Sequence, residues 1–192
     1  PQESPGAEPG EALAATEARC SARDQIRLYG DALRNPTPSA EEANALARLF
    51  AARDGEVTVL SGTDASLPRL TDETPSRRLI HLATHSVLGA PGRPYEASLA
   101  LSSPASYTAN DDGFLSVDDL LRDWRGKLSD TDVLVLSASS SNVAHARAQP
   151  LLLPWAFVRS GARTVVTSLW STHAAARTLL LQRFYANLLG TG

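Results

Sequence analysis

The chain has 192 residues, enough for one well-packed domain, and a second large domain is not expected. Apolar residues make up 43% of the chain and charged residues 20%, which is typical of a globular protein and not of a disordered or fibrous one. The net charge of -3 and the scattered arginines give no reason to expect direct binding of nucleic acid or of a membrane, and no apolar run approaches the ~20 residues of a membrane span.

The ends of the chain and its one cysteine suggest its context. Cys20 is the only cysteine and cannot form an internal disulfide, which fits a reducing compartment such as the cytoplasm. The chain starts at Pro1 and contains no methionine, so we expect a domain that belongs to a longer protein. Residues 1–22 are rich in Pro, Glu, Gly and Ala, which predicts a linker or disordered segment, followed by a folded domain over residues 23–192.

Strands and helices are then expected to alternate. Gln25–Tyr29 is a weak strand. Ser39 is followed three residues later by Glu42, a capping-box spacing that predicts a helix start. The inner face of this helix is predicted from the three- and four-residue spacing of Ala43, Leu46, Ala47 and Phe50.

The rest of the chain continues this alternation. Strands are predicted over Glu56–Leu60, Arg78–Ala83, Ala97–Leu101, Asp132–Ala138 and Arg163–Trp170. Helices are predicted over Ser116–Asp123, Leu151–Arg159 and Thr172–Leu189. Gly161 is expected in the left-handed position after Leu151–Arg159. Leu180, Phe184 and Leu188 are expected along one side of Thr172–Leu189. Several strands are continuously apolar, as in parallel sheets covered on both faces, so we expect a three-layer α/β/α sandwich with a mostly parallel sheet.

Two of the predicted strands are followed by residues that can do chemistry. LIHLATH ends at His85, and VLVLSASSSN carries Ser139 within a run of serines. Ligands bind beyond the carboxyl ends of strands in open parallel sheets, and neighbouring strands lie about 4.8 Å apart. If these strands are neighbours, His85 and Ser139 have the geometry of a base and a nucleophile. The same serine run is also typical of a turn, and the nucleophile pattern G-x-S-x-G is absent.

A metal site is not expected. His81 and His85 are four residues apart, but in a strand they lie about 13 Å from each other, too far to share one ion. His81 is therefore predicted to be a hydrogen-bonded histidine in or near the core.

Six motifs occur in a recognisable order: LIHLATHS, ASLALS, DDGFLSVDDLL, VLVLSASSS, AFVRSGARTVVTSLW and RFYANLL. With them the chain resembles, over roughly residues 25–189, the CHAT domain, a caspase-like domain of the caspase and separase clan. The resemblance implies a caspase-like fold and a cysteine endopeptidase that acts on a protein or peptide and needs no cofactor. It also implies tetratricopeptide repeats or another regulatory domain in the same longer protein.

The resemblance assigns roles to individual residues. His85 takes the place of the general base, and Ser139 stands where the family has its nucleophilic cysteine, with backbone N–H groups at Ser86 and Ser139 toward the oxyanion. A serine hydroxyl is far less acidic than a thiol, so the chain is expected to be inactive as written. Asp111 and Asp112 would attract a basic P1 side chain, although an Asn-Asp-Asp-Gly stretch is also typical of a solvated turn.

The serine at position 139 leaves several readings open. It is either a deliberate Cys→Ser change or the mark of a natural pseudoprotease. The function expected from the resemblance is a cysteine endopeptidase domain. The alternatives are a non-catalytic module that binds peptides or proteins, and a serine hydrolase that acts through Ser139 and His85.

Overall fold

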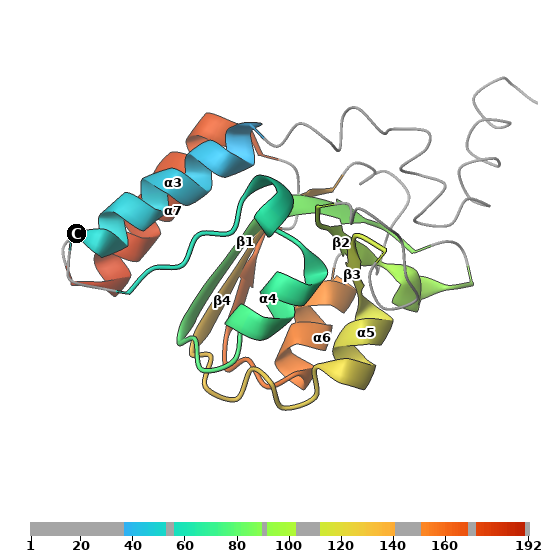
Figure 1. Ribbon diagram of the computed structural model, residues 1–192. Coiled ribbons are helices and arrows are strands. Elements are labelled where there is room, and N and C mark those ends of the chain that lie inside the picture. Colours follow the sequence, from blue (N-terminus) through green and yellow to red (C-terminus); the bar gives the residue numbers. More distant parts are fainter. Residues whose placement is uncertain are drawn as a thin grey trace, which may run out of the picture.

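The computed structural model describes residues 37–52, 56–89, 92–102, 112–140, 151–168 and 172–190. In this part of the chain a five-stranded sheet has the order β3-β2-β1-β4-β5 (Figure 1). The strands are β1 (Leu79–Val87), β2 (Ser98–Ala100), β3 (Phe114–Ser116), β4 (Val133–Ser140) and β5 (Val165–Thr167). β4 runs parallel to both β1 and β5, whereas β2 runs antiparallel to β1 and β3. The expected parallel centre is therefore present, with an antiparallel extension on one side.

Helices cover both faces of this sheet, which confirms the predicted α/β layers (Figure 1). One face carries α4 (Leu67–Glu73), α5 (Val117–Asp123) and α6 (Leu152–Arg159). The other carries α3 (Thr37–Ala51) and α7 (Ala174–Leu188), which lie side by side. Two short 3₁₀ turns, Gly62–Asp64 and Pro94–Glu96, lie in the connections.

The alternation of side chains along β4 sends successive residues into two separate cores. Leu134 and Leu136 pack toward α4, α5 and α6, where Phe157 is fully buried. Val135, between them, packs toward α3 and α7 against Leu46. This period of two is why a continuously apolar strand fits a sheet that is covered on both faces.

Two predicted helix ends are confirmed. The helix expected from Ser116 does start there: α5 has a capping box, in which the Ser116 hydroxyl accepts the N–H of Asp119 and the Asp119 carboxylate accepts the N–H of Ser116. Gly161 follows α6 with a φ of 117°. A Cβ there would lie 2.8 Å from the backbone nitrogen of Ser129, so only glycine fits this turn.

The predicted strand Glu56–Leu60 is wrong. No strand forms there in the described residues, and Val57 and Val59 are 38% and 41% exposed. Strand preference depends on a neighbouring strand to pack against, and β1 already has β2 on one side and β4 on the other.

The predicted capping box of the first helix is also wrong. α3 begins at Thr37, so Ser39 lies inside it. Glu42 is fully buried and contacts β1 and α7. Its carboxylate therefore makes hydrogen bonds to other elements of the fold and does not cap the start of its own helix.

The buried side of the last helix lies one residue away from the apolar row predicted along it. Leu181 and Tyr185 are the buried residues of α7, whereas Leu180 and Leu188 are 68% and 46% exposed and Phe184 is half-buried. One residue is a rotation of about 100°, enough to turn a leucine from core to solvent.

The predicted strand Gln25–Tyr29 and the end of Arg163–Trp170 lie outside the described residues. Two further differences concern the antiparallel side of the sheet. β3 was not predicted, and the antiparallel direction of β2 was not either, because three-residue strands carry too little pattern to be read.

Candidate active site

The pairing of β1 with β4 brings the two candidate residues together. The parallel register runs without a break from Leu79 opposite Val133 to Ser86 opposite Ser140, and it sets His85 opposite Ser139. Partners in adjacent strands lie about 4.8 Å apart. The condition set by the sequence analysis, that the two strands are neighbours, is therefore met. The predicted strand ends are wrong in one detail. His85 and Ser139 lie within their strands, near the carboxyl ends, because β1 extends to Val87 and β4 to Ser140.

Strand alternation also assigns the two positions to one face. His81 contacts α3 and α7, so His85, four residues later on β1, belongs to the same face. On β4, Val135 packs in the core under α3 and α7, and Ser139 follows it by four residues. Positions 85 and 139 therefore match both in register and in face.

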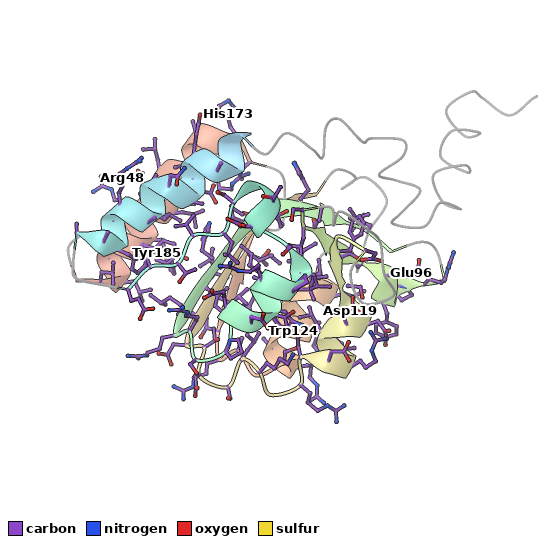
Figure 2. All side chains as sticks on the ribbon, in the orientation of Figure 1. Arg48, Glu96, Asp119, Trp124, His173 and Tyr185 are labelled. Carbon is purple, nitrogen blue, oxygen red and sulfur yellow. The ribbon has the colours of Figure 1, made fainter. Side chains whose placement is uncertain are left out.

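A buried polar network lies on this same face, between the helices and the sheet. The Glu42 carboxylate is fully buried; its Oε1 lies 2.9 Å from His81 Nε2 and its Oε2 lies 3.0 Å from Arg177 Nε. Thr178 Oγ1 lies 3.4 Å from Oε2. His81 Nδ1 lies 3.1 Å from the hydroxyl of Tyr185, a residue labelled in Figure 2 in the layer between helices and sheet. The prediction of a hydrogen-bonded His81 near the core is confirmed.

The surroundings decide the charge of Glu42. Burial alone raises the pKa of its carboxyl, but the hydrogen bond with His81, the nearby Ser137 hydroxyl and the hydrogen bond from Arg177 more than offset this, so the pKa lies below its usual range. Glu42 is thus a carboxylate at neutral pH, held beside a guanidinium. Burial, and to a smaller extent the Glu42 charge, raises the pKa of Tyr185, which therefore keeps its hydroxyl proton.

Ser137 lies between this network and the candidate site. It is opposite Ala83 on β1 and only 3% exposed. Its Oγ meets hydrogen-bond geometry with no group in the described part of the chain, yet it is close enough to Glu42 to lower the pKa of that carboxyl. Its effect on Glu42 is therefore electrostatic.

The other predicted site residues are more distant or undescribed. Asp111 lies outside the described residues. Asp112 is half-buried, and its Oδ1 accepts the N–H of Phe114 at 3.1 Å, which makes a turn at the start of β3. Since β2 separates β3 from β1, this turn lies about two strand spacings, or roughly 10 Å, from the strand that carries His85. Ser86 lies in β1 with Leu99 and Ser140 as its partners.

The described residues contain no group of three or more histidine, cysteine or acidic side chains placed to hold a metal ion. They also contain no helix that is both long and apolar enough to cross a membrane.

The comparison with protein families is decisive at this point. The CHAT domain matches residues 13–192. The chain belongs to the CHAT domain family. Membership makes it a relative of caspase-like peptidases, and its sheet, with parallel β1, β4 and β5 and helices on both faces, is consistent with that fold. No curated protein and no solved structure gives a significant match.

The network around Glu42 was the main feature that sequence reasoning missed in this CHAT domain. The signal available was the single histidine within the apolar run LIHLAT, which indicated a hydrogen-bonded residue but no partner. The partners come from positions 42, 177 and 185, and only the fold brings these together.

Proposed function

We propose that this CHAT domain is a caspase-like cysteine endopeptidase domain in which position 139 carries the nucleophile and His85 is the general base. The observation that supports this most directly is the register, which sets His85 opposite Ser139 on adjacent parallel strands. Family membership supplies the reaction class. With serine at position 139, the chain has little or no peptidase activity.

The chemistry follows for a thiol at position 139. The His85 imidazole takes the thiol proton, and the thiolate attacks the carbonyl carbon of the scissile peptide bond. Backbone N–H groups at position 139 and near Ser86 hold the oxyanion that forms, a stabilisation of roughly 3–4 kcal/mol per donor in comparable sites. The C–N bond then breaks, and His85 gives its proton to the leaving amine. Water, deprotonated by His85, releases the acyl group as a carboxylic acid and restores the thiol.

Serine at this position interrupts the first step. A thiol with a pKa near 8.5 yields a usable thiolate beside an imidazole, whereas a hydroxyl needs an accurately placed and strongly basic partner. The remaining parts of the site are unaffected by this exchange, so restoring the thiol restores activity.

The same proposal extends to substrate and context. Asp111 and Asp112 favour Lys or Arg at P1 in a protein or peptide substrate. The domain works in the cytoplasm without a cofactor, beside tetratricopeptide repeats or another regulatory domain in the same longer protein.

The test restores the thiol and nothing else. Ser139→Cys is made together with Cys20→Ser, so that the new thiol is the only one, and the protein is incubated with a peptide library. The matched control is Ser140→Cys in the same background, since residue 140 is the next position of β4 and pairs with Ser86 instead of His85. Cleavage is expected in the Ser139→Cys protein alone, and His85→Ala abolishes it.

Other outcomes identify the alternatives. Cleavage by the unaltered chain, blocked by a phosphonate, would make it a serine hydrolase. Peptide binding without turnover in every variant would make it a non-catalytic module. The residues found at P1 show directly whether the acidic turn selects a basic side chain.

A further inference from the structure

We propose that Glu42 is a positioning residue for the candidate site: through His81 and Arg177 it fixes β1 against α3 and α7, and so keeps His85 aligned with position 139. This inference rests on the proposed function, because it concerns the alignment of that same base and nucleophile.

The first support is the connectivity of the network. An imidazole protonated on Nε2 donates to Glu42 Oε1 and accepts the Tyr185 hydroxyl proton on Nδ1. Arg177 donates to the other carboxylate oxygen. The hydrogen bonds thus run from α7 to β1, on to α3, and back to α7 two turns earlier. Glu42 on α3 thus links β1, through His81, to α7, through Arg177.

The second support is where the network acts. His81 lies on the strand that carries His85 and on the same face, four residues or about 13 Å earlier. Ser137, also near Glu42, lies on the strand of position 139, two residues before it. The network therefore holds β1 four residues before His85 and lies beside β4 two residues before position 139.

The third support is that the Glu42 network is not needed for the stability of the fold. A buried ion pair is often no more stable than well-packed apolar side chains of similar volume, because desolvation offsets the attraction between the charges. The opposite face of the same sheet is filled mainly with apolar side chains. Hydrogen bonds are directional, so they fix the position of a strand, whereas apolar contacts tolerate small shifts of the strand.

Charge balance fits the same role. Glu42 is negative and Arg177 positive, and the side chains are 0% and 11% exposed. The pair therefore aligns β1 while imposing little net charge on His85. Its contribution to the reaction acts through geometry, and removing the carboxylate also leaves an unpaired guanidinium on this face.

The experiment uses the Ser139→Cys, Cys20→Ser protein as its parent. Glu42→Gln keeps the shape and removes the charge, and Tyr185→Phe removes only the hydroxyl while the ring keeps its contacts with Phe50 and Phe184. Glu41→Gln is the matched control, the exposed neighbour on the same helix. For each protein we measure kcat and KM on a cleaved peptide, the rate at which iodoacetamide alkylates the thiol between pH 5 and 9, and the folded fraction.

Glu42→Gln is expected to lower kcat ten- to a hundredfold, about the cost of a misplacement near 1 Å, with little change in KM. Its alkylation profile should move toward that of the His85→Ala parent. Tyr185→Phe should lower kcat less and in the same direction, and it carries the test if Glu42→Gln does not fold. Glu41→Gln should match the parent.

The failures are distinguishable. If alkylation of the parent depends on His85 but the Glu42 and Tyr185 variants keep the parent profile, the positioning role is wrong and the proposed function stands. A fall in activity that only follows the folded fraction, with an unchanged profile, would likewise make the network purely structural. If alkylation of the parent is the same with and without His85, the proposed function is wrong and this inference falls with it.

Discussion

The two faces of the sheet are built from different chemistry. Under α4, α5 and α6 lies one large apolar cluster, with Leu99, Leu115, Leu120, Leu128, Leu134 and Phe157 among its fully buried members. Under α3 and α7 the buried apolar residues are fewer, namely Leu46, Val135, Leu181 and Tyr185. The fully buried Glu42 carboxylate and the buried Ser137 lie in the same layer.

The difference shows how one sheet separates stability from alignment. Apolar burial is strong and non-directional, so the first face supplies most of the free energy of folding. Hydrogen bonds between buried charged and polar groups add little net stability but restrict geometry, and they lie on the face that carries positions 85 and 139. Substitutions on the apolar face should therefore mainly lower stability, and substitutions on the polar face should mainly disturb alignment.

The largest effect is expected on the apolar face. Phe157→Ala removes a fully buried ring from α6 and should lower the free energy of unfolding by about 3–5 kcal/mol, because the cavity left behind cannot fully collapse. Urea unfolding followed by circular dichroism measures this. Trp155→Ala on the same helix is the control, since that ring is 44% exposed and should cost much less. Equal losses in the two variants would contradict the assignment of the inner face.

The next effect concerns the polar face. Arg177→Met leaves a fully buried carboxylate without its guanidinium and should cost about 3 kcal/mol in unfolding free energy. Adding Glu42→Leu removes the unpaired charge, so the double variant should recover most of that loss. Urea unfolding of both single variants and the double variant completes the cycle. A double variant no more stable than Arg177→Met would show that the ion pair itself stabilises the fold.

Much of this fold is predictable because its signals are local. The apolar run of β4, the helix start at Ser116 and the left-handed Gly161 each depend on neighbours within a few residues, and each prediction is confirmed. The pairing of β1 with β4 could be anticipated from two apolar strands with chemically active ends. Local signals also mislead: Ser39 and Glu42 have capping-box spacing, but burial against β1 and α7 decides where the Glu42 carboxylate goes.

The features that sequence could not give depend on long-range geometry. Glu42 meets Arg177 from across most of the chain, and no spacing rule relates the two. The stretch Glu56–Leu60 has strand-forming residues, yet forming a strand requires a free neighbour in the sheet. The position of Asp112 relative to His85 likewise depends on β2, which lies between them in the sheet.

The smallest effect distinguishes the two faces by their response to acid. Burial raises and hydrogen bonding lowers the pKa of Glu42, and the net pKa in the folded state is lowered, below the value of about 4.3 expected for an unfolded glutamate. The unfolded chain therefore takes up this proton first on acidification. The stability that Glu42 contributes is complete above about pH 4.3 and is lost as the pH falls through the pKa of the folded state.

Urea unfolding between pH 6 and 3 tests this. The free energy of unfolding should fall less steeply with acid for the Glu42→Leu, Arg177→Met double variant than for the unaltered chain. Phe157→Ala, which removes no titrating group, should lower the curve by a similar amount at every pH. If the double variant keeps the full acid loss, that loss arises from carboxylates elsewhere, and the polar face is not where acid acts.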